Sequence, residues 1–188
     1  MVSIRKYEQK DREGVHFVCH NSDGPEEVPD FLTGQFYHNT FCNYYIEHEP
    51  ENCFVLDDNG RVVGYIICAE NFDRFEEIFN SEYLPRSDSY GEGRYDWAST
   101  AYNAQKKFKD EYPAHFHVDI LPEYQRMGLG GKLIETLCDH LAKKGICGVC
   151  LTCGPRNEKA VNFYKKYDFT LLSLDYDDAC FGKNLRKL

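Results

Sequence analysis

The sequence lacks an excess of basic residues, since 22 lysines and arginines face 31 aspartates and glutamates and the net charge is −9. Binding to phosphate backbones needs Lys and Arg in excess, so this balance argues against a nucleic-acid partner. The longest apolar stretch, Val62–Ala69, is far shorter than the ~20 residues of a membrane helix, so no membrane partner is expected. The acidic charge is compatible with a cationic substrate such as an amine.

The nine cysteines show no disulfide framework, because their number is odd and they are scattered from Cys19 to Cys180. The N-terminus turns charged at once, which is not the pattern of a signal peptide. We therefore predict reduced thiols in a cytoplasmic protein. Cys147, Cys150 and Cys153 lie at and directly before the predicted strand 148–153. Residues three apart on a strand point to opposite faces, so we expect no metal site there.

The length of 188 residues and a 42% hydrophobic content suit one domain with a real core. Apolar periodicity and turn signals predict the secondary structure. Asn59-Gly60 predicts a tight hairpin turn, and Leu133, Leu137, Cys138 and Leu141 form one apolar stripe of a predicted helix. Strands are expected at residues 3–7, 53–56, 61–69, 114–121, 148–153, 169–174 and 181–185. Helices are expected from an N-cap at Asp11 through Cys19, and at residues 31–45, 128–144 and 157–167. Strands that alternate with helices favour an α/β (α+β) fold, with a mixed, twisted central sheet flanked by helices.

Residues 71–112 are too long for a plain connection between two strands and predict a partly helical insertion, with a second helical stretch near residues 99–109. The segment carries several large aromatic residues, namely Tyr83, Tyr90, Tyr95 and Trp97. They are candidates for an acceptor-site lid or a dimer surface. A satellite hydrophobic cluster that covers the sheet explains them equally well.

The strongest local feature is the run Gln-Arg-Met-Gly-Leu-Gly-Gly at residues 125–131, between a predicted strand and a predicted helix. Such a turn leaves backbone N–H groups unpaired at a helix N-terminus, where the helix dipole favours an anion. The run is a candidate phosphate cradle. It lacks the Lys-Ser/Thr of a P-loop and the glycine spacing of a dinucleotide fold, and an ordinary glycine-rich turn is the alternative.

Together with the segment 157–169, this run resembles the GNAT acetyltransferase family. The cofactor signature Gln/Arg-x-x-Gly-x-Gly/Ala and a second signature, an Asn followed by a helix with Tyr and then Phe, are matched by Gln125, Gly128, Gly130, Asn157, Tyr164 and Phe169. The resemblance is specific over residues 114–170, is limited to the order of elements over 1–70, and is absent over 71–112. It implies a single GNAT domain over 1–188.

Residues 112–125 resemble, more closely, the acetyltransferase-like domain of animal O-GlcNAc hydrolases and its stand-alone bacterial relatives. That domain has been described as lacking clear catalytic competence in animals. A non-catalytic acetyl-CoA-binding or protein-interaction domain is therefore the alternative to an enzyme. The intact glycine motif and Tyr164 favour the enzyme, because a scaffold needs neither.

The family resemblance implies a role for each matched residue. Acetyl-CoA, as co-substrate, would lie between the strands at 114–121 and 148–153. Its pyrophosphate would be bound by the backbone amides of Gln125, Arg126, Met127, Gly128, Leu129, Gly130 and Gly131. The strand edge at Val118 and Ile120 would pair with the pantetheine arm and offer an N–H to the thioester oxygen. Asn157 would contact the arm, and Tyr164 would protonate the leaving thiolate unless it merely packs in the core.

The general base is not assigned by the resemblance, because Ala114 stands where some histone-modifying members have Glu. His115, His117 and Asp119 alternate on one strand and so share a face. They could line the acceptor cleft, with Asp119 or His117 as the base, or form a structural hydrogen-bonded cluster. Asp168 stands where the family has Gly, and Asp tolerates the left-handed backbone that the turn needs.

The resulting expectation is an N-acetyltransferase, which transfers an acetyl group directly to an amine in a ternary complex without a covalent enzyme intermediate. A protein lysine, an aminosugar, a polyamine or another small amine could be the acceptor. The oligomeric state stays open, and a dimer is possible.

Overall fold

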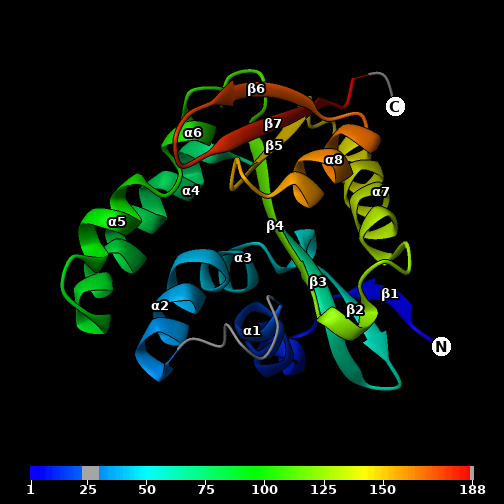
Figure 1. Cartoon of the computed structure of the whole chain (residues 1–188), viewed down its shortest axis with the longest axis horizontal. Helices are drawn as coiled ribbons and strands as arrows, with labels where there is room; N and C mark the ends of the chain where they lie inside the picture. Colours follow the sequence, from blue (N-terminus) through cyan, green and yellow to red (C-terminus); the bar gives the residue numbers. More distant parts are fainter. Residues whose placement is uncertain (23–29, 187–188) are drawn as a thin grey trace.

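The computed structural model describes residues 1–22 and 30–186 of the chain. Within them, seven strands form one mixed sheet in the order β1-β2-β3-β4-β5-β7-β6, flanked by helices (Figure 1). The strands are β1 Ser3–Lys6, β2 Phe54–Asp58, β3 Arg61–Ala69, β4 Ala114–Ile120, β5 Gly148–Cys153, β6 Thr170–Leu174 and β7 Ala179–Asn184. The helices are α1 Arg12–Asn21, α2 Phe31–Phe41, α3 Asn43–His48, α4 Phe72–Ile78, α5 Arg94–Thr100, α6 Asn103–Lys106, α7 Leu129–Lys143 and α8 Glu158–Lys166. The predicted fold class is confirmed.

Strand β3 forms the centre of the core, since every residue after Arg61 is buried. Successive side chains of a strand point to opposite faces, so both faces of the sheet must be covered here. Helix α1 packs on β3 from one side, and α7 packs on β2, β3 and β4 from the other (Figure 1). The predicted apolar stripe of α7 is confirmed by the burial of Leu133, Leu137 and Leu141.

The hairpin between β2 and β3 is confirmed at Asn59 and Gly60, whose φ angles are 54° and 90°. These two left-handed residues are the signature of the tight turn that an Asn-Gly pair favours. Asp168 also has a positive φ, 63°, so the turn after α8 is preserved without the glycine that the family has there. The predicted N-cap Asp11 lies at the start of α1, but its carboxylate accepts from the Glu8 amide and from Arg5.

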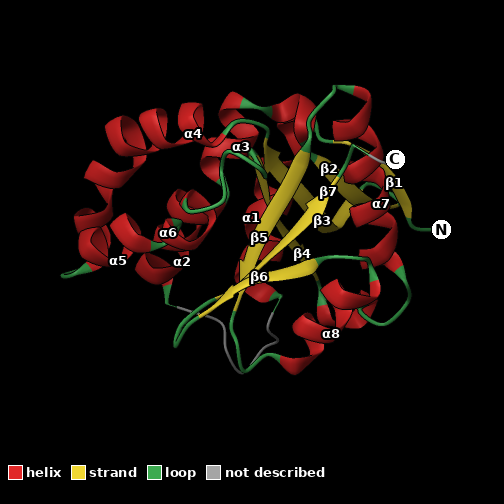
Figure 2. Cartoon of the chain, turned by 90° about the horizontal axis from the view of Figure 1, so that it is seen from above, coloured by secondary structure: helices red, strands yellow, loops and turns green. Residues whose placement is uncertain are grey.

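Two helical predictions were wrong in detail. The helix expected over residues 31–45 is broken at Cys42, whose backbone leaves the helical region, so that α2 and α3 are separate (Figure 2). Cys42 is fully buried, and its Sγ lies 3.9 Å from the Tyr65 hydroxyl, so tertiary packing outweighs helix continuity there. The stretch expected near 99–109 is divided between α5 and α6.

The segment 71–112 is helical, as predicted, and packs beside the sheet as α4, a π-turn over Phe79–Tyr83, a 3₁₀ turn over Leu84–Tyr90, α5 and α6 (Figure 2). Tyr83 is fully buried, and Trp97 lies edge-on to Phe36 and Phe41 of α2. These contacts match the satellite-cluster interpretation, although Tyr95 and Trp97 keep 42% and 48% of their surface exposed. None of the helices in the described residues has the length and apolar character of a membrane span.

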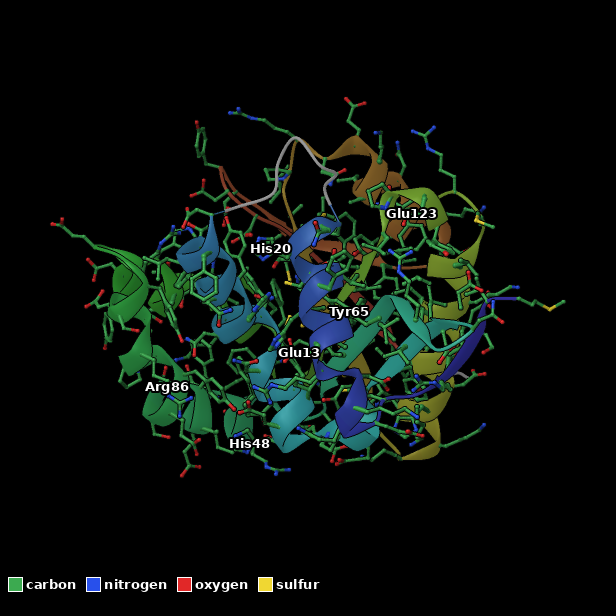
Figure 3. The ribbon with its side chains drawn as sticks, turned by 90° about the horizontal axis from the view of Figure 1, so that it is seen from below. Glu13, His20, His48, Tyr65, Arg86 and Glu123 are labelled. Carbon is green, nitrogen blue, oxygen red and sulfur yellow. The ribbon has the colours of Figure 1, made fainter. Side chains whose placement is uncertain are left out.

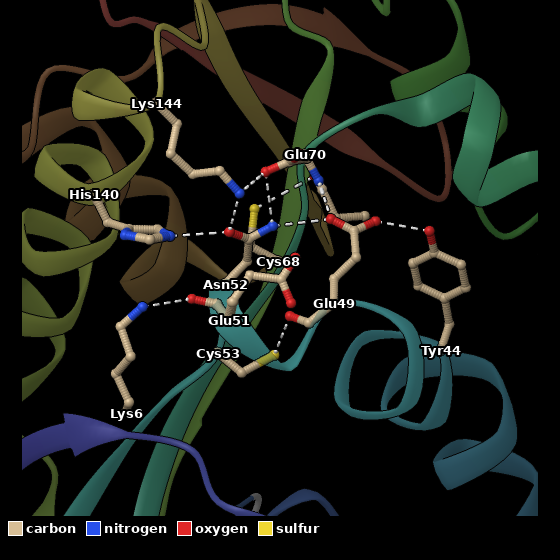
Figure 4. A network of polar contacts seen from close by, with 11 residues as sticks. Lys6, Tyr44, Glu49, Glu51, Asn52, Cys53, Cys68, Glu70, His140 and Lys144 are labelled. Carbon is tan, nitrogen blue, oxygen red and sulfur yellow. Dashed lines mark hydrogen bonds and ion pairs between the residues drawn. The ribbon is translucent and has the colours of Figure 1, made fainter.

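A buried polar network joins α7 to the central strands (Figure 4). The carboxylate of Glu49 accepts hydrogen bonds from the Tyr44 hydroxyl at 2.7 Å, Asn52 at 2.9 Å and the Glu70 amide at 2.8 Å. Lys144, just after α7, donates to Asn52 Oδ1 at 2.9 Å and pairs with Glu70. Because the buried Glu49 carboxylate is hydrogen-bonded and the partly exposed Glu70 is paired with Lys144, the network can hold the α7 end against the sheet.

Candidate active site

The predicted phosphate cradle is a tight turn before α7. Arg126 and Gly128 both have positive φ angles, 61° and 77°, and Gly128 caps the helix without a side-chain hydrogen bond. The first backbone bond of the helix runs from Lys132 N to Gly128 O. In the described part of the chain, none of the backbone N–H groups over residues 126–131 has an acceptor. The turn therefore presents consecutive amide donors at the positive end of a 15-residue helix.

Gln125 stabilises this turn by backbone and side-chain hydrogen bonds. Its amide donates to the Pro122 carbonyl at 3.2 Å, and its side-chain Nε2 donates to the carbonyls of Ile120 and Ser22 at 2.9 and 3.0 Å. The backbone N–H of Gln125 is thus already used, and the open donors begin at Arg126. Gly131 is required by packing, because a Cβ there would lie 1.7 Å from the Tyr167 hydroxyl oxygen.

Strand β4 parts from β5 halfway along its length. The parallel pairing covers only Ala114 with Val149 and His115 with Cys150, although both strands continue. Leu121 N donates to Val63 O of β3, and backbone groups alternate sides along a strand. The N–H groups of Val118 and Ile120 therefore point away from β3, into the space that β5 has left. The two strands therefore part at Val118 and Ile120, and β4 offers backbone N–H groups without partners there.

Tyr164 lies on α8 with 8% of its surface exposed and packs against Phe163, Phe169 and Phe181. Burial raises the pKa of its hydroxyl, and the nearby Cys153 and Asp119 raise it further. The phenol is therefore protonated at neutral pH and can donate. No described residue hydrogen-bonds this hydroxyl, so packing holds the ring and leaves the O–H available.

Asn157 caps α8, since its Oδ1 accepts from the Ala160 amide at 3.0 Å. This cap is a structural reason for an asparagine at that position. The side-chain NH₂ makes no hydrogen bond within residues 1–22 and 30–186, so a contact with a bound molecule is compatible with the cap.

On the opposite face of β4, His117 and Asp119 meet a residue that the sequence analysis missed. The Tyr65 hydroxyl lies 2.8 Å from Asp119 Oδ2 and 3.0 Å from His117 Nδ1. His117 and Asp119 keep 31% and 23% of their side chains exposed. Phe41 of α2 also stacks on the His117 ring, with centroids 5.3 Å apart. In the sequence, Tyr65 is set apart from the apolar residues around it on the strand 61–69 by its hydroxyl group, and that difference alone could have indicated a role in the site.

His115 shares the face of His117, as predicted, but it does not line a cleft. It is 1% exposed and surrounded by aromatic rings, among them Phe75 at 4.4 Å and Tyr102 at 5.5 Å. Neither ring nitrogen has a hydrogen-bond partner in the described structure. Burial lowers the pKa of His115 to about 3, so the ring is neutral at neutral pH. Because the side chain is buried, it is not accessible to an acceptor amine.

The cysteines are all free thiols. Across the described residues, no group of three or more His, Cys, Asp and Glu side chains could hold a metal ion. Cys150 is buried on β5, whereas Cys147 and Cys153 are partly exposed. Cys150 thus packs as a small apolar residue of a core strand, whereas Cys147 precedes the strand and Cys153 ends it.

The sequence model of the Acetyltransferase (GNAT) family matches residues 16–169. The chain therefore belongs to the GNAT acetyltransferase family, which uses acetyl-CoA.

Curated relatives include the [ribosomal protein bS18]-alanine N-acetyltransferase of Escherichia coli K12, 37% identical over 69 residues. That match spans 37% of this chain and 42% of the relative. Among solved structures, SsHAT has a TM-score of 0.85 at 26% identity over 98% of both chains. The PaiA N-acetyltransferase of Thermoplasma acidophilum, in complex with coenzyme A, has a TM-score of 0.62 at 15% identity over 98% and 99% of the two chains. The last likeness shows the fold alone.

Proposed function

We propose that this chain, as one domain over residues 1–188, binds acetyl-CoA along the open edge of β4 and transfers the acetyl group to an amine. One observation carries the proposal. The open amides of residues 126–131 follow the unpaired N–H groups of Val118 and Ile120 along the chain. The Tyr164 hydroxyl, which has no hydrogen-bond partner in the described structure, is electrostatically coupled to Cys153 of β5 and Asp119 of β4, the two strands that part. Main-chain donors suit an anionic ligand on a chain whose net charge is −9.

In the proposed reaction, the amides of the cradle hold the pyrophosphate and the β4 edge pairs with the pantetheine arm. The acceptor amine loses a proton to His117 or Asp119 and attacks the thioester carbon. A backbone N–H at Val118 or Ile120 stabilises the oxyanion. The new C–N bond forms, the C–S bond breaks, and the leaving thiolate takes a proton from Tyr164.

The acceptor is an amine of unassigned identity. A peptide with an N-terminal alanine belongs in the test, because the E. coli relatives are named for that substrate. A lysine peptide, an aminosugar and a polyamine cover the other classes. The finer likeness to the O-GlcNAc hydrolase-associated domain rests on residues 112–125 and stays a prediction. It supplies the alternative of acetyl-CoA binding without turnover.

Two measurements test the proposal. Acetyl-CoA should raise the melting temperature of the protein in a concentration-dependent way, because a ligand that binds only the folded state stabilises it. Release of CoA thiol should then depend on one of the four amines. The Tyr164→Phe variant should keep the thermal shift and lose turnover by about 10²-fold. Stabilisation without turnover on any amine favours the binding module, and absence of stabilisation contradicts both functions.

A further inference from the structure

Tyr65 is the residue that joins His117 and Asp119. It lies on β3, where Figure 3 labels it. In the antiparallel register it is directly opposite Asp119, and its side chain is fully buried. Its hydroxyl oxygen lies 2.8 Å from Asp119 Oδ2 and 3.0 Å from His117 Nδ1. Burial and the Asp119 charge raise the pKa of Tyr65 well above its ordinary value, so the hydroxyl keeps its proton.

The single proton of this hydroxyl decides which nitrogen of His117 carries hydrogen. An ionised carboxylate can only accept, so the Tyr65 O–H donates to Asp119. The same oxygen can then only accept from His117, which requires a proton on Nδ1. Asp119 Oδ2 also lies 3.6 Å from Nδ1, and its negative charge favours the same protonated nitrogen.

The other nitrogen of His117 is left as a free base. The neutral imidazole has one N–H, so a proton on Nδ1 leaves a lone pair on Nε2. In the described part of the chain, Nε2 has no hydrogen-bond partner, and about a third of the side chain is exposed. Phe41 and Tyr65 lie nearly parallel to the imidazole, at interplanar angles of 15° and 23°, and restrict its rotation.

We propose that Tyr65 is a positioning residue that fixes His117 as the Nδ1–H tautomer and so directs Nε2 toward the acceptor amine as general base. The inference rests on the proposed function for the amine, while the tautomer itself is a property of the protein alone. In the reaction, Nε2 takes one proton from the attacking amine, and the resulting imidazolium is stabilised by the Tyr65–Asp119 pair.

Nuclear magnetic resonance of the ¹⁵N-histidine-labelled protein tests the tautomer without any activity. The His117→Gln variant assigns the signal by its absence. In the wild type, Nδ1 of His117 should be protonated and Nε2 unprotonated. In Tyr65→Phe, which keeps the ring, the preference should shift toward the Nε2–H form, because 3.6 Å is beyond a hydrogen bond to Asp119.

Tyr45→Phe is the matched control. Tyr45 is equally buried, and its hydroxyl contacts Tyr102 at 3.4 Å, away from His117. The Tyr45→Phe variant should lose about as much stability as Tyr65→Phe and should leave the His117 signals unchanged. Protonated Nε2 in the wild type, or the same tautomer in wild type and Tyr65→Phe, overturns the inference.

Kinetic measurements on the same variants distinguish failure of this inference from failure of the proposed function. Tyr65→Phe should lower kcat on the order of 10-fold to 100-fold, with unchanged acetyl-CoA affinity and a changed pH profile of kcat. Tyr45→Phe should leave kcat and its pH profile unchanged. If no amine is acetylated by the wild type, the proposed function fails, and the tautomer measurement still decides the role of Tyr65. Equal kcat and pH profiles in Tyr65→Phe and wild type contradict that role.

Discussion

His115 and His117 lie on the same strand and face the same side of the sheet, yet their surroundings have little in common. His115 stands where β4 is paired on both edges, is fully buried, and has no hydrogen-bond partner in the described structure. His117 stands beyond the last pair with β5, is partly exposed, and lies within hydrogen-bond distance of Tyr65. The strand thus has a closed half that belongs to the core and an open half whose side chains are partly exposed.

Two histidines on the same face of β4 therefore differ in exposure and hydrogen bonding, because the pairing of β4 with β5 ends between them. A buried imidazole without a partner is held neutral by desolvation and has no access to a substrate. An imidazole beside an open edge can exchange protons. The first two experiments below compare the two halves of β4, and the next two test the groups proposed to bind acetyl-CoA beside the open half.

The largest effect is expected for the two histidines themselves. His117→Gln should lower kcat by about 10²- to 10⁴-fold, the usual contribution of a general base, and leave acetyl-CoA affinity unchanged. His115→Phe should stay within about threefold of wild type, because that ring is buried among aromatic rings such as Phe75. Initial rates of CoA release measure both. Similar losses in the two variants, or none in either, would contradict the division of the strand.

The acid sensitivity of the fold should depend on the closed half. The pKa of His115 is about 3 in the folded protein and 6.5 ordinarily, so its contribution to stability is present above pH 6.5 and is lost as pH falls toward 3. From pH 7 to pH 5 the loss is about 2 kcal/mol. Urea unfolding at both pH values should show that the free energy of unfolding falls less in His115→Phe than in the wild type, by this amount. An unchanged drop would mean that His115 is solvated.

The cradle can be probed at Met127, because its side chain is 61% exposed and can be replaced without disturbing the core. Met127→Glu places a negative charge beside the open amides and should weaken acetyl-CoA about tenfold through repulsion of the pyrophosphate. Met127→Gln has nearly the same size without the charge and should bind like the wild type. Calorimetric titration gives both affinities. Equal binding by the two variants would place the pyrophosphate elsewhere.

The smallest effect separates the two roles of Asn157. Asn157→Ser keeps a side-chain oxygen that can cap α8 and removes the NH₂ donor. It should leave the free energy of unfolding within about 0.5 kcal/mol and weaken acetyl-CoA by about threefold. Asn157→Ala should in addition lose about 1 kcal/mol of stability. If the Ser variant binds acetyl-CoA as the wild type does, Asn157 is only a cap.

Local sequence patterns predicted much of this fold. Periodicity predicted most of the strands and α7, and Asn59-Gly60 predicted the hairpin, because these signals lie within a few neighbouring residues. The glycine run predicted the turn before α7 for the same reason. The break at Cys42 was not predictable, since it follows from packing against Tyr65, 23 positions further along the chain.

The candidate site was predictable in the same uneven way. Alternation placed His115 and His117 on one face, as observed, but depth of burial depends on where β5 departs and on the aromatic helices of 71–112. No local pattern carries that information. Tyr65 was missed because a tyrosine within an apolar strand has the pattern of a core residue, and only the register with β4 brings it to Asp119.

The most direct test of the whole account is amide hydrogen exchange with and without acetyl-CoA. The open half of β4 and the cradle have amides without internal partners, whereas the closed half is already paired. Acetyl-CoA should therefore slow exchange of the amides of Val118, Ile120 and residues 126–131 and leave residues 114–116 unchanged. Protection that is absent from these open amides, or that appears only in the aromatic helices around His115, would contradict the account.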